Sequence, residues 1–342
     1  MKFIRNIFIL AAMVFMLSAC SLIGGKESID PPQDVSYEED LDVTKDDGAE
    51  TEKEGKVKTE LYLIDKDGYV VPQTFELPNT ESVAKQALDH LVKDGPITDQ
   101  LPNDFRAVLP AGTETSVDIK DGVATVNFSN EFTEYAPEDE LKILQSVTWT
   151  LTQFDSIEKV NLKLNGKQLK EMPVNGTPIN GELTRKNGIN IETNVADITN
   201  TYPVTVYYLA QSNEKSYYVP VTKRVSNKVD NPVMAVVNEL IKGPNTSSTL
   251  YTLFMPDVQL VDEPKLDNGI VKLNFNENIY GSYDQKLVSK QVLEPLVLSL
   301  TEQEGVEGVS IQVNGDTNVV NQDGQTLSEP VTRPASVNTS SY

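Results

Sequence analysis

The chain has 342 residues, a formal net charge of −22 and a single cysteine, Cys20. So acidic a surface repels phosphate backbones, which argues against nucleic acid as a partner. With one cysteine the chain can form no intramolecular disulfide, so its folded part must rely on hydrophobic cores, and it is long enough to build two.

Residues 1–19 have the form of a secretory signal peptide. Lys2 and Arg5 make a short positive region, residues 7–17 are almost unbroken apolar sequence, and small residues lead to Cys20. The apolar run is too short for a comfortable membrane span. The ending resembles a bacterial lipobox, so we predict lipidation of Cys20 and membrane attachment through its lipid anchor. An ordinary cleavable signal that happens to contain a cysteine is the alternative.

Residues 20–60 are predicted to be the lipidated N-terminus and an acidic tether. Between residues 26 and 60 there are thirteen Asp or Glu against five Lys, and the apolar residues are scattered. High charge with low hydrophobicity cannot support a packed core, so we expect this segment to be disordered and to hold the domains away from the membrane. A charged recognition segment is the alternative.

The rest of the chain contains one unit of about 130 residues twice, which is the size of a domain. The most evident matches, at offsets between 145 and 149, are Val71-Pro72 with Val219-Pro220, Gly95-Pro96 with Gly243-Pro244, and Leu164-Asn165-Gly166 with Val313-Asn314-Gly315. This duplication predicts a first domain at residues 61–185, a linker at 186–203, a second domain at 204–335 and a polar tail at 336–342.

Each copy predicts the order β-β-α-β-β-α-β. In the first copy, two β-rich runs flank the turn Asp67-Gly68, and apolar residues at helical spacing follow, with Thr80 as the expected N-cap. The equivalent helix of the second copy is expected to start with Asn231 as cap and Pro232 at its first position. Gly95 and Gly243 are expected to stop these helices.

The second half of each copy predicts a hairpin, a longer helix and a final strand. The hairpins turn at Asp121-Gly122 and at Asn268-Gly269, and the longer helix of the first copy opens at Pro137. In the second copy Pro295 falls inside this helix and should kink or shorten it. The expected fold class is α+β, with two tandem two-layer domains, each a mostly antiparallel sheet packed on two helices.

The sequence gives little sign of catalytic chemistry. His90 is the only histidine and lies near the end of an amphipathic helix, which favours a surface or boundary residue over a metal or catalytic one. The run Asp65-Lys66-Asp67-Gly68 begins like a calcium loop but lacks the later ligands, and a hairpin turn explains it better. We therefore predict no catalytic residue, no cofactor and no metal site.

Tyrosines gather on the first hairpin of each copy. They are Tyr62, Tyr207, Tyr208, Tyr217 and Tyr218. Tyrosine is common in strands and also enriched at interfaces, because it offers contact area with a polar tip. Strand propensity is the favoured explanation here, and an interface is the alternative.

Several long runs resemble the GerMN domain family, which occurs in sporulation and spore-germination lipoproteins. They are residues 29–35 in the tether, 105–110 and 146–154 in the first copy, and 219–224 in the second. The resemblance implies two GerMN domains, similar to the ring-building folds of secretion systems. It also implies a sporulation and germination role between mother cell and forespore, with proteins of an extracytoplasmic complex as partners. It supplies no catalytic residues.

Three functions compete at this point. The favoured one is a non-enzymatic, lipid-anchored assembly protein located outside the cytoplasm. The second is an enzyme or wall-binding protein acting on peptidoglycan, which would need two carboxylates roughly 5–10 Å apart in a cleft. The third is a small-molecule-binding lipoprotein, but such proteins usually show longer parallel-sheet patterns than this chain does.

Overall fold

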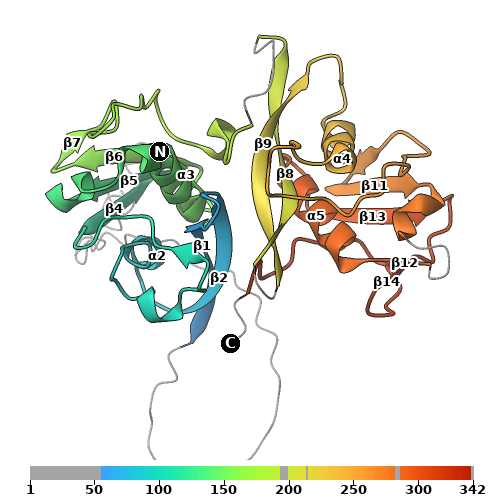
Figure 1. The fold of residues 1–342 in the computed structure, drawn as a ribbon, viewed down its shortest axis with the longest axis horizontal. Coiled ribbons are helices and arrows are strands. Elements are labelled where there is room, and N and C mark those ends of the chain that lie inside the picture. The colour runs from blue at the N-terminus through green and yellow to red at the C-terminus, as the bar shows by residue number, and fades with distance from the viewer. Residues whose placement is uncertain (1–54, 193–198, 213–214, 282–285, 340–342) are drawn as a thin grey trace, which may run out of the picture.

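The computed structural model describes residues 55–192, 199–212, 215–281 and 286–339 (Figure 1). The predicted signal peptide, the lipidation site Cys20 and most of the predicted tether lie outside these residues. The two copies of the repeat lie side by side, and the long hairpin of each faces the other at the centre of the molecule (Figure 1).

The first repeat opens with a long antiparallel hairpin of β1 (Lys56–Asp65) and β2 (Val70–Pro78). A short strand, β3 (Phe105–Arg106), pairs with the end of β1. Alternating burial in β1 already begins at Val57 and Thr59. The predicted tether therefore extends too far, because residues 56–60 belong to the first strand.

The predicted start of the first helix is also displaced. Helix α2 (Val83–Asp89) has Ser82 rather than Thr80 as its N-cap, and no side chain caps it. The helix ends at Asp89, with His90 as its C-cap, before Gly95 is reached. Side-chain oxygens at both Thr80 and Ser82 suit a cap, so sequence alone could not separate them.

The second half of the repeat forms a four-stranded sheet in the order β4-β5-β6-β7. Its strands are β4 (Thr115–Lys120), β5 (Val123–Phe128), β6 (Lys159–Leu164) and β7 (Lys167–Gln168). Strands β5 and β6 are parallel, because the chain between them crosses over through helix α3, while the other pairs are antiparallel. Asp121 and Gly122 both have positive φ angles, as a tight hairpin turn requires.

Helix α3 (Glu140–Leu151) is the centre of the first core. It packs against β1, β6 and α2, and its residues from Ile143 to Leu151 are all buried. A helix buried on every side needs a layer on each of two faces, and the hairpin and the four-stranded sheet provide them. The α+β class is confirmed, with the strands of the first repeat divided between two sheets.

The second repeat follows the same plan. Its long hairpin is β8 (Thr201–Gln211) and β9 (Ser216–Ser226), and its helices are α4 (Pro232–Lys242) and α5 (Lys290–Leu300). The remaining strands are β10 (Lys265–Asp267), β11 (Ile270–Phe275), β12 (Leu287–Val288), β13 (Gly308–Val313), β14 (Val320–Asn321) and β15 (Val331–Thr332). Short 3-10 turns connect these elements at Thr98–Gln100, Asn130–Thr133, Pro137–Asp139, Arg185–Asn187 and Glu277–Tyr280.

The predicted start and end of the first helix of the second repeat are confirmed. Asn231 caps α4 by accepting hydrogen bonds from two backbone N–H groups, and Pro232 is the first helical residue. Gly243 ends α4 with φ +80°. Helix α5 continues through Pro295 and has 11 residues, against 12 in α3.

The ends of both repeats differ from the prediction. Ile189, placed in the expected linker 186–203, is completely buried, and Val337, placed in the expected polar tail 336–342, is 1% exposed. Strand β8 already begins at Thr201. Residues 186–192 and 336–338 are therefore structural parts of the repeats.

Candidate functional site: the contact between the repeats

The edge strands of the two long hairpins, β2 and β9, lie beside each other without pairing directly. Pro72 and Pro220 stand in these edges and have no N–H to donate, which prevents a regular ladder. Asn190 fills the gap instead. Its side-chain amide donates to the carbonyls of Val70 and Pro220, both at 2.8 Å, and accepts from the N–H of Val70 at 2.8 Å.

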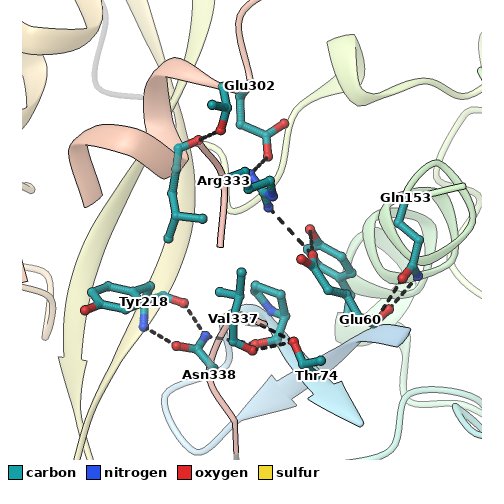
Figure 2. Close-up of polar contacts among 12 residues, drawn as sticks. Glu60, Thr74, Gln153, Tyr218, Glu302, Arg333, Val337 and Asn338 are labelled. Atoms are coloured by element: carbon teal, nitrogen blue, oxygen red, sulfur yellow. Dashed lines mark hydrogen bonds and ion pairs between the residues drawn. The ribbon is translucent and has the colours of Figure 1, made fainter. Parts of the chain in front are cut away.

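Asn338 does the same from the other repeat. Its amide donates to the carbonyls of Pro72 and Tyr218 and accepts from the N–H of Tyr218, all at 2.8 Å (Figure 2). Asn190 and Asn338 have φ angles of +46° and +53°, in the left-handed region that asparagine tolerates better than most residues. Each asparagine thus binds the backbone of both hairpins.

The residue before each asparagine binds the hairpin of the opposite repeat. Ile189 donates its N–H to the hydroxyl of Thr222 at 2.9 Å and accepts from the N–H of Thr222 at 2.8 Å. Val337 does the same with Thr74, at 2.8 and 3.0 Å (Figure 2). We call the four residues Ile189, Asn190, Val337 and Asn338 the asparagine clasp.

A buried ionic cluster lies beside the clasp. Glu302, whose side chain is 7% exposed, binds Arg185 of the first repeat at 2.9 Å and Arg333 of its own repeat at 3.0 Å. Tyr207 donates its hydroxyl to the same carboxylate at 2.9 Å. Arg333 also faces Glu60 of the first repeat at 3.7 Å (Figure 2). Two of these ion pairs therefore join the repeats.

The charges in the cluster determine the ionisation of Glu302. Burial alone would raise the pKa of its carboxyl, but the positive charges of Arg185 and Arg333 hold the pKa below its ordinary value. The carboxylate is therefore charged at neutral pH. A buried charge of this kind is tolerated only because it is paired and hydrogen-bonded.

The tyrosines are on strands, as their β propensity predicts, and one of them also joins the repeats. Tyr62, Tyr207 and Tyr208 are no more than 1% exposed. Tyr217 donates its hydroxyl across the contact to the carboxylate of Asp65 at 2.9 Å. Burial raises the pKa of Asp65 above its ordinary value, against the hydrogen bonds that stabilise its charged form.

The run 65–68 forms a hairpin turn. Asp65 accepts from the N–H groups of Asp67 at 3.0 Å and Tyr69 at 2.8 Å, and Gly68 has φ +87°. His90 is 8% exposed, and its Nδ1 lies 2.7 Å from the carbonyl of Gln86 in the preceding turn. Among the residues that the structure describes, no group of three or more His, Cys, Asp or Glu could hold a metal ion.

Each repeat also carries a shallow groove at an equivalent place. The first lies between α3 and the end of its repeat and is lined by Leu141, Leu144, Thr148, Leu183 and Thr184. The second lies between α5 and β15 and is lined by the matching Lys290, Leu293, Val297, Val331 and Thr332. The clasp therefore holds two similar grooves in one body.

No helix of the described residues is long and apolar enough to cross a membrane.

The sequence carries a signal for this contact at the end of each repeat. Thr184-Arg185 and Ile189-Asn190 recur at the same spacing as Thr332-Arg333 and Val337-Asn338. Thr332 ends β15, but Ile189-Asn190 and Val337-Asn338 lie beyond the last strand of each unit, where polar sequence suggests a linker or tail. The predicted domains end at residues 185 and 335, so they include the Thr-Arg pairs but leave out Ile189-Asn190 and Val337-Asn338.

Comparison with known proteins agrees with the tandem architecture. Spore germination protein GerM of Bacillus subtilis (strain 168) is 53% identical over 348 aligned positions, which cover 96% of this chain and 95% of that protein. Lipoprotein LpqB of Thermobifida fusca (strain YX) is 31% identical over 119 positions, which cover 33% of this chain and 19% of that protein.

A solved structure shows the same arrangement. The tandem GerMN domains of the sporulation protein GerM from Bacillus subtilis superpose with a TM-score of 0.80 at 56% identity, covering 84% of this chain and all of that one. The profile of the Germane family, described as "Sporulation and spore germination", matches residues 60–170 and 205–319, which are the two repeats. The chain belongs to the Germane family of sporulation and spore germination proteins.

Proposed function

We propose that this protein is a non-enzymatic, membrane-anchored lipoprotein that assembles with proteins of an envelope-spanning complex at the mother cell–forespore membranes. The family supports the role in sporulation and germination. The assembly role is supported by one observation above all. Two copies of one domain are locked together, so that equivalent surfaces are presented in a fixed relation.

Fixed geometry favours binding through both repeats. Two sites on one body bind a matching partner about 10²–10⁴-fold more tightly than either alone, provided that their spacing fits. The two grooves are candidate contact surfaces of this kind, and segments of partner proteins are the proposed occupants. Leu141, 48% exposed at the rim of the first groove, is available for such a contact.

The test is recovery of partners by a tagged extracytoplasmic part from sporulating cells. We expect envelope-complex proteins to be recovered, and Leu141→Asp and Lys290→Asp each to lower recovery, with a stronger effect together. Leu266→Asp is the matched control, since this side chain is 52% exposed and lies outside both grooves. Equal loss in the control, or no loss with both groove variants, contradicts the proposal.

A peptidoglycan-acting protein would give another result in the same experiment. Release or binding of muropeptides, abolished by one carboxylate substitution while partner recovery survives, would replace the assembly role with an enzymatic one. We expect instead that any Asp or Glu substitution that abolishes function also impairs folding or partner binding.

The anchor is tested separately at Cys20. Cys20→Ser should leave an unlipidated precursor, because only a thiol can receive the lipid at this position. Metabolic labelling with a fatty-acid probe measures this directly. Label that persists in the variant contradicts the proposed anchor, whatever the outcome of the partner experiment.

A further inference from the structure

We infer that the contact between the repeats is homotypic, so that the first repeat alone can pair with a second copy of itself through the same clasp. The contact is reciprocal in the manner of a two-fold dimer. Ile189 of the first repeat binds Thr222 of the second, and the equivalent Val337 of the second binds Thr74 of the first. Reciprocity of this kind is the property of a self-complementary surface.

Four residues of the contact are identical in the two repeats. Pro72 matches Pro220 at the strand edges, Thr74 matches Thr222, Arg185 matches Arg333 and Asn190 matches Asn338. Most of the clasp hydrogen bonds go to backbone atoms, whose positions depend on the shared fold and not on the identity of neighbouring side chains. A second copy of the first repeat therefore offers the same donors and acceptors as the second repeat does.

The side chains around the clasp would also find partners in a pair of first repeats. Tyr69 is the counterpart of Tyr217, so it would place its hydroxyl beside Asp65 of the other copy. Arg185 is the counterpart of Arg333, so it would face Glu60 of the other copy. Two arginines would then meet two glutamates, and the buried cluster would keep its charge balance although Gln153 replaces Glu302.

The first repeat has a core of its own. One hydrophobic cluster contains buried residues from Leu61 to Ile189 only, without any residue of the second repeat. A second cluster contains residues of the second repeat together with Val71 from β2, and Tyr69 and Phe105 of the first repeat pack against it. A separate core of this size is what a domain needs to fold alone.

The inference identifies the kind of partner that this surface fits. It fits another domain of the same fold with a proline-interrupted edge strand and a Thr-Arg tail ending in Ile-Asn or Val-Asn. In the intact chain the second repeat occupies the surface, so the two-repeat protein is a covalently joined pair of domains. This inference does not depend on the proposed partners or on the membrane anchor.

The experiment measures self-association of residues 55–192 by sedimentation equilibrium, with circular dichroism as the check of folding. We expect a folded dimer, and Asn190→Ala should weaken self-association at least about tenfold, because each dimer would contain two such amides. Asn175→Ala is the control, since Asn175 is exposed and outside the contact. A dimer that Asn190→Ala leaves unchanged would overturn the inference.

A second arm begins from the folded two-repeat protein. A protease site replaces residues 193–198, and after cleavage a labelled first-repeat fragment is added in excess. We expect the two halves to stay associated and the labelled fragment to enter complexes with both repeats. A fragment that remains monomeric at all concentrations, that fails to fold or that does not exchange contradicts homotypic pairing.

Discussion

The two repeats make the same backbone contacts with each other but differ in the side chains around them. Gln153 of the first repeat binds the N–H and carbonyl of Glu60, both at 2.7 Å, whereas its counterpart Glu302 binds two arginines. Backbone contacts follow from the common fold, so both repeats retain them. Contacts between side chains depend on residue identity, so the two repeats can differ there and still fit each other.

The largest effect is expected when Glu302 is made like Gln153. Glu302→Gln leaves Arg185 and Arg333 buried without their shared carboxylate, which should lower the free energy of unfolding by about 3 kcal/mol. Urea unfolding followed through Trp149, the only tryptophan, measures it. Glu304→Gln is the control, because that side chain is 92% exposed and should change stability by less than about 0.5 kcal/mol. Equal effects would contradict the role of the cluster.

Glu140 provides a second difference, because Ser289 stands at its place in the second repeat. The carboxylate accepts hydrogen bonds from the N–H groups of Val174 and Thr177 and from Tyr135. Burial opposes ionisation, but hydrogen bonds from Asn175, Thr177 and Tyr135 lower the pKa of Glu140 to about 2. Glu140→Gln should cost about 2 kcal/mol at pH 7.

The pH dependence of that loss follows from the sign of the shift. A depressed pKa gives stability that is fully present above the ordinary value of 4.5 and is lost as the pH falls toward about 2. Thermal melting at pH 7, 4.5 and 3 should therefore show the difference between wild type and Glu140→Gln becoming smaller in acid. A difference that stays constant over this range would show that the charge of Glu140 is not what stabilises the loop.

The clasp tests the symmetric part of the comparison. Asn190→Ala and Asn338→Ala should each lower the free energy of unfolding by about 2 kcal/mol, because each removes three hydrogen bonds from a side-chain amide to backbone groups and places alanine in the left-handed region. Chemical denaturation of the two single variants checks this, with Asn175→Ala as control. Clearly unequal costs would mean that the two halves of the clasp are not equivalent.

The smallest effect is expected at the two tyrosines that reach across the contact. Tyr217→Phe removes a buried hydrogen bond to Asp65 and should cost about 1 kcal/mol. Tyr69→Phe removes a bond to Ser248 that is only partly buried, and should cost less. Matched unfolding curves decide the order, and a larger cost for Tyr69→Phe would contradict the assignment of Asp65 and Tyr217 as the stronger pair.

Local patterns in the sequence predicted most of the fold. The duplication, the hairpin turn at Asp121-Gly122 and the Asn231 cap were readable, because each depends on a few neighbouring residues. The parallel pairing of β5 with β6 was harder to see, since it is set by a crossover and not by a turn.

The contact between the repeats was not predicted, for a physical reason. The clasp residues Asn190 and Asn338 are polar and follow the last strand of each repeat, as linker residues commonly do. Their partners lie between 30 and 266 positions away along the chain. No local periodicity reports such contacts, and only comparison of the two repeat ends against each other would have shown them.

The most direct test of this account is a distance distribution between the two repeats in solution. Cys20 is the only natural cysteine, so in residues 55–342 spin labels at Val174→Cys and Val261→Cys, both exposed, would be the only labels. Pulsed electron resonance should give one narrow distribution, which broadens in the Asn190→Ala/Asn338→Ala double variant. A distribution that is already broad in the protein with an intact clasp would contradict the claim that the clasp holds the repeats as one body.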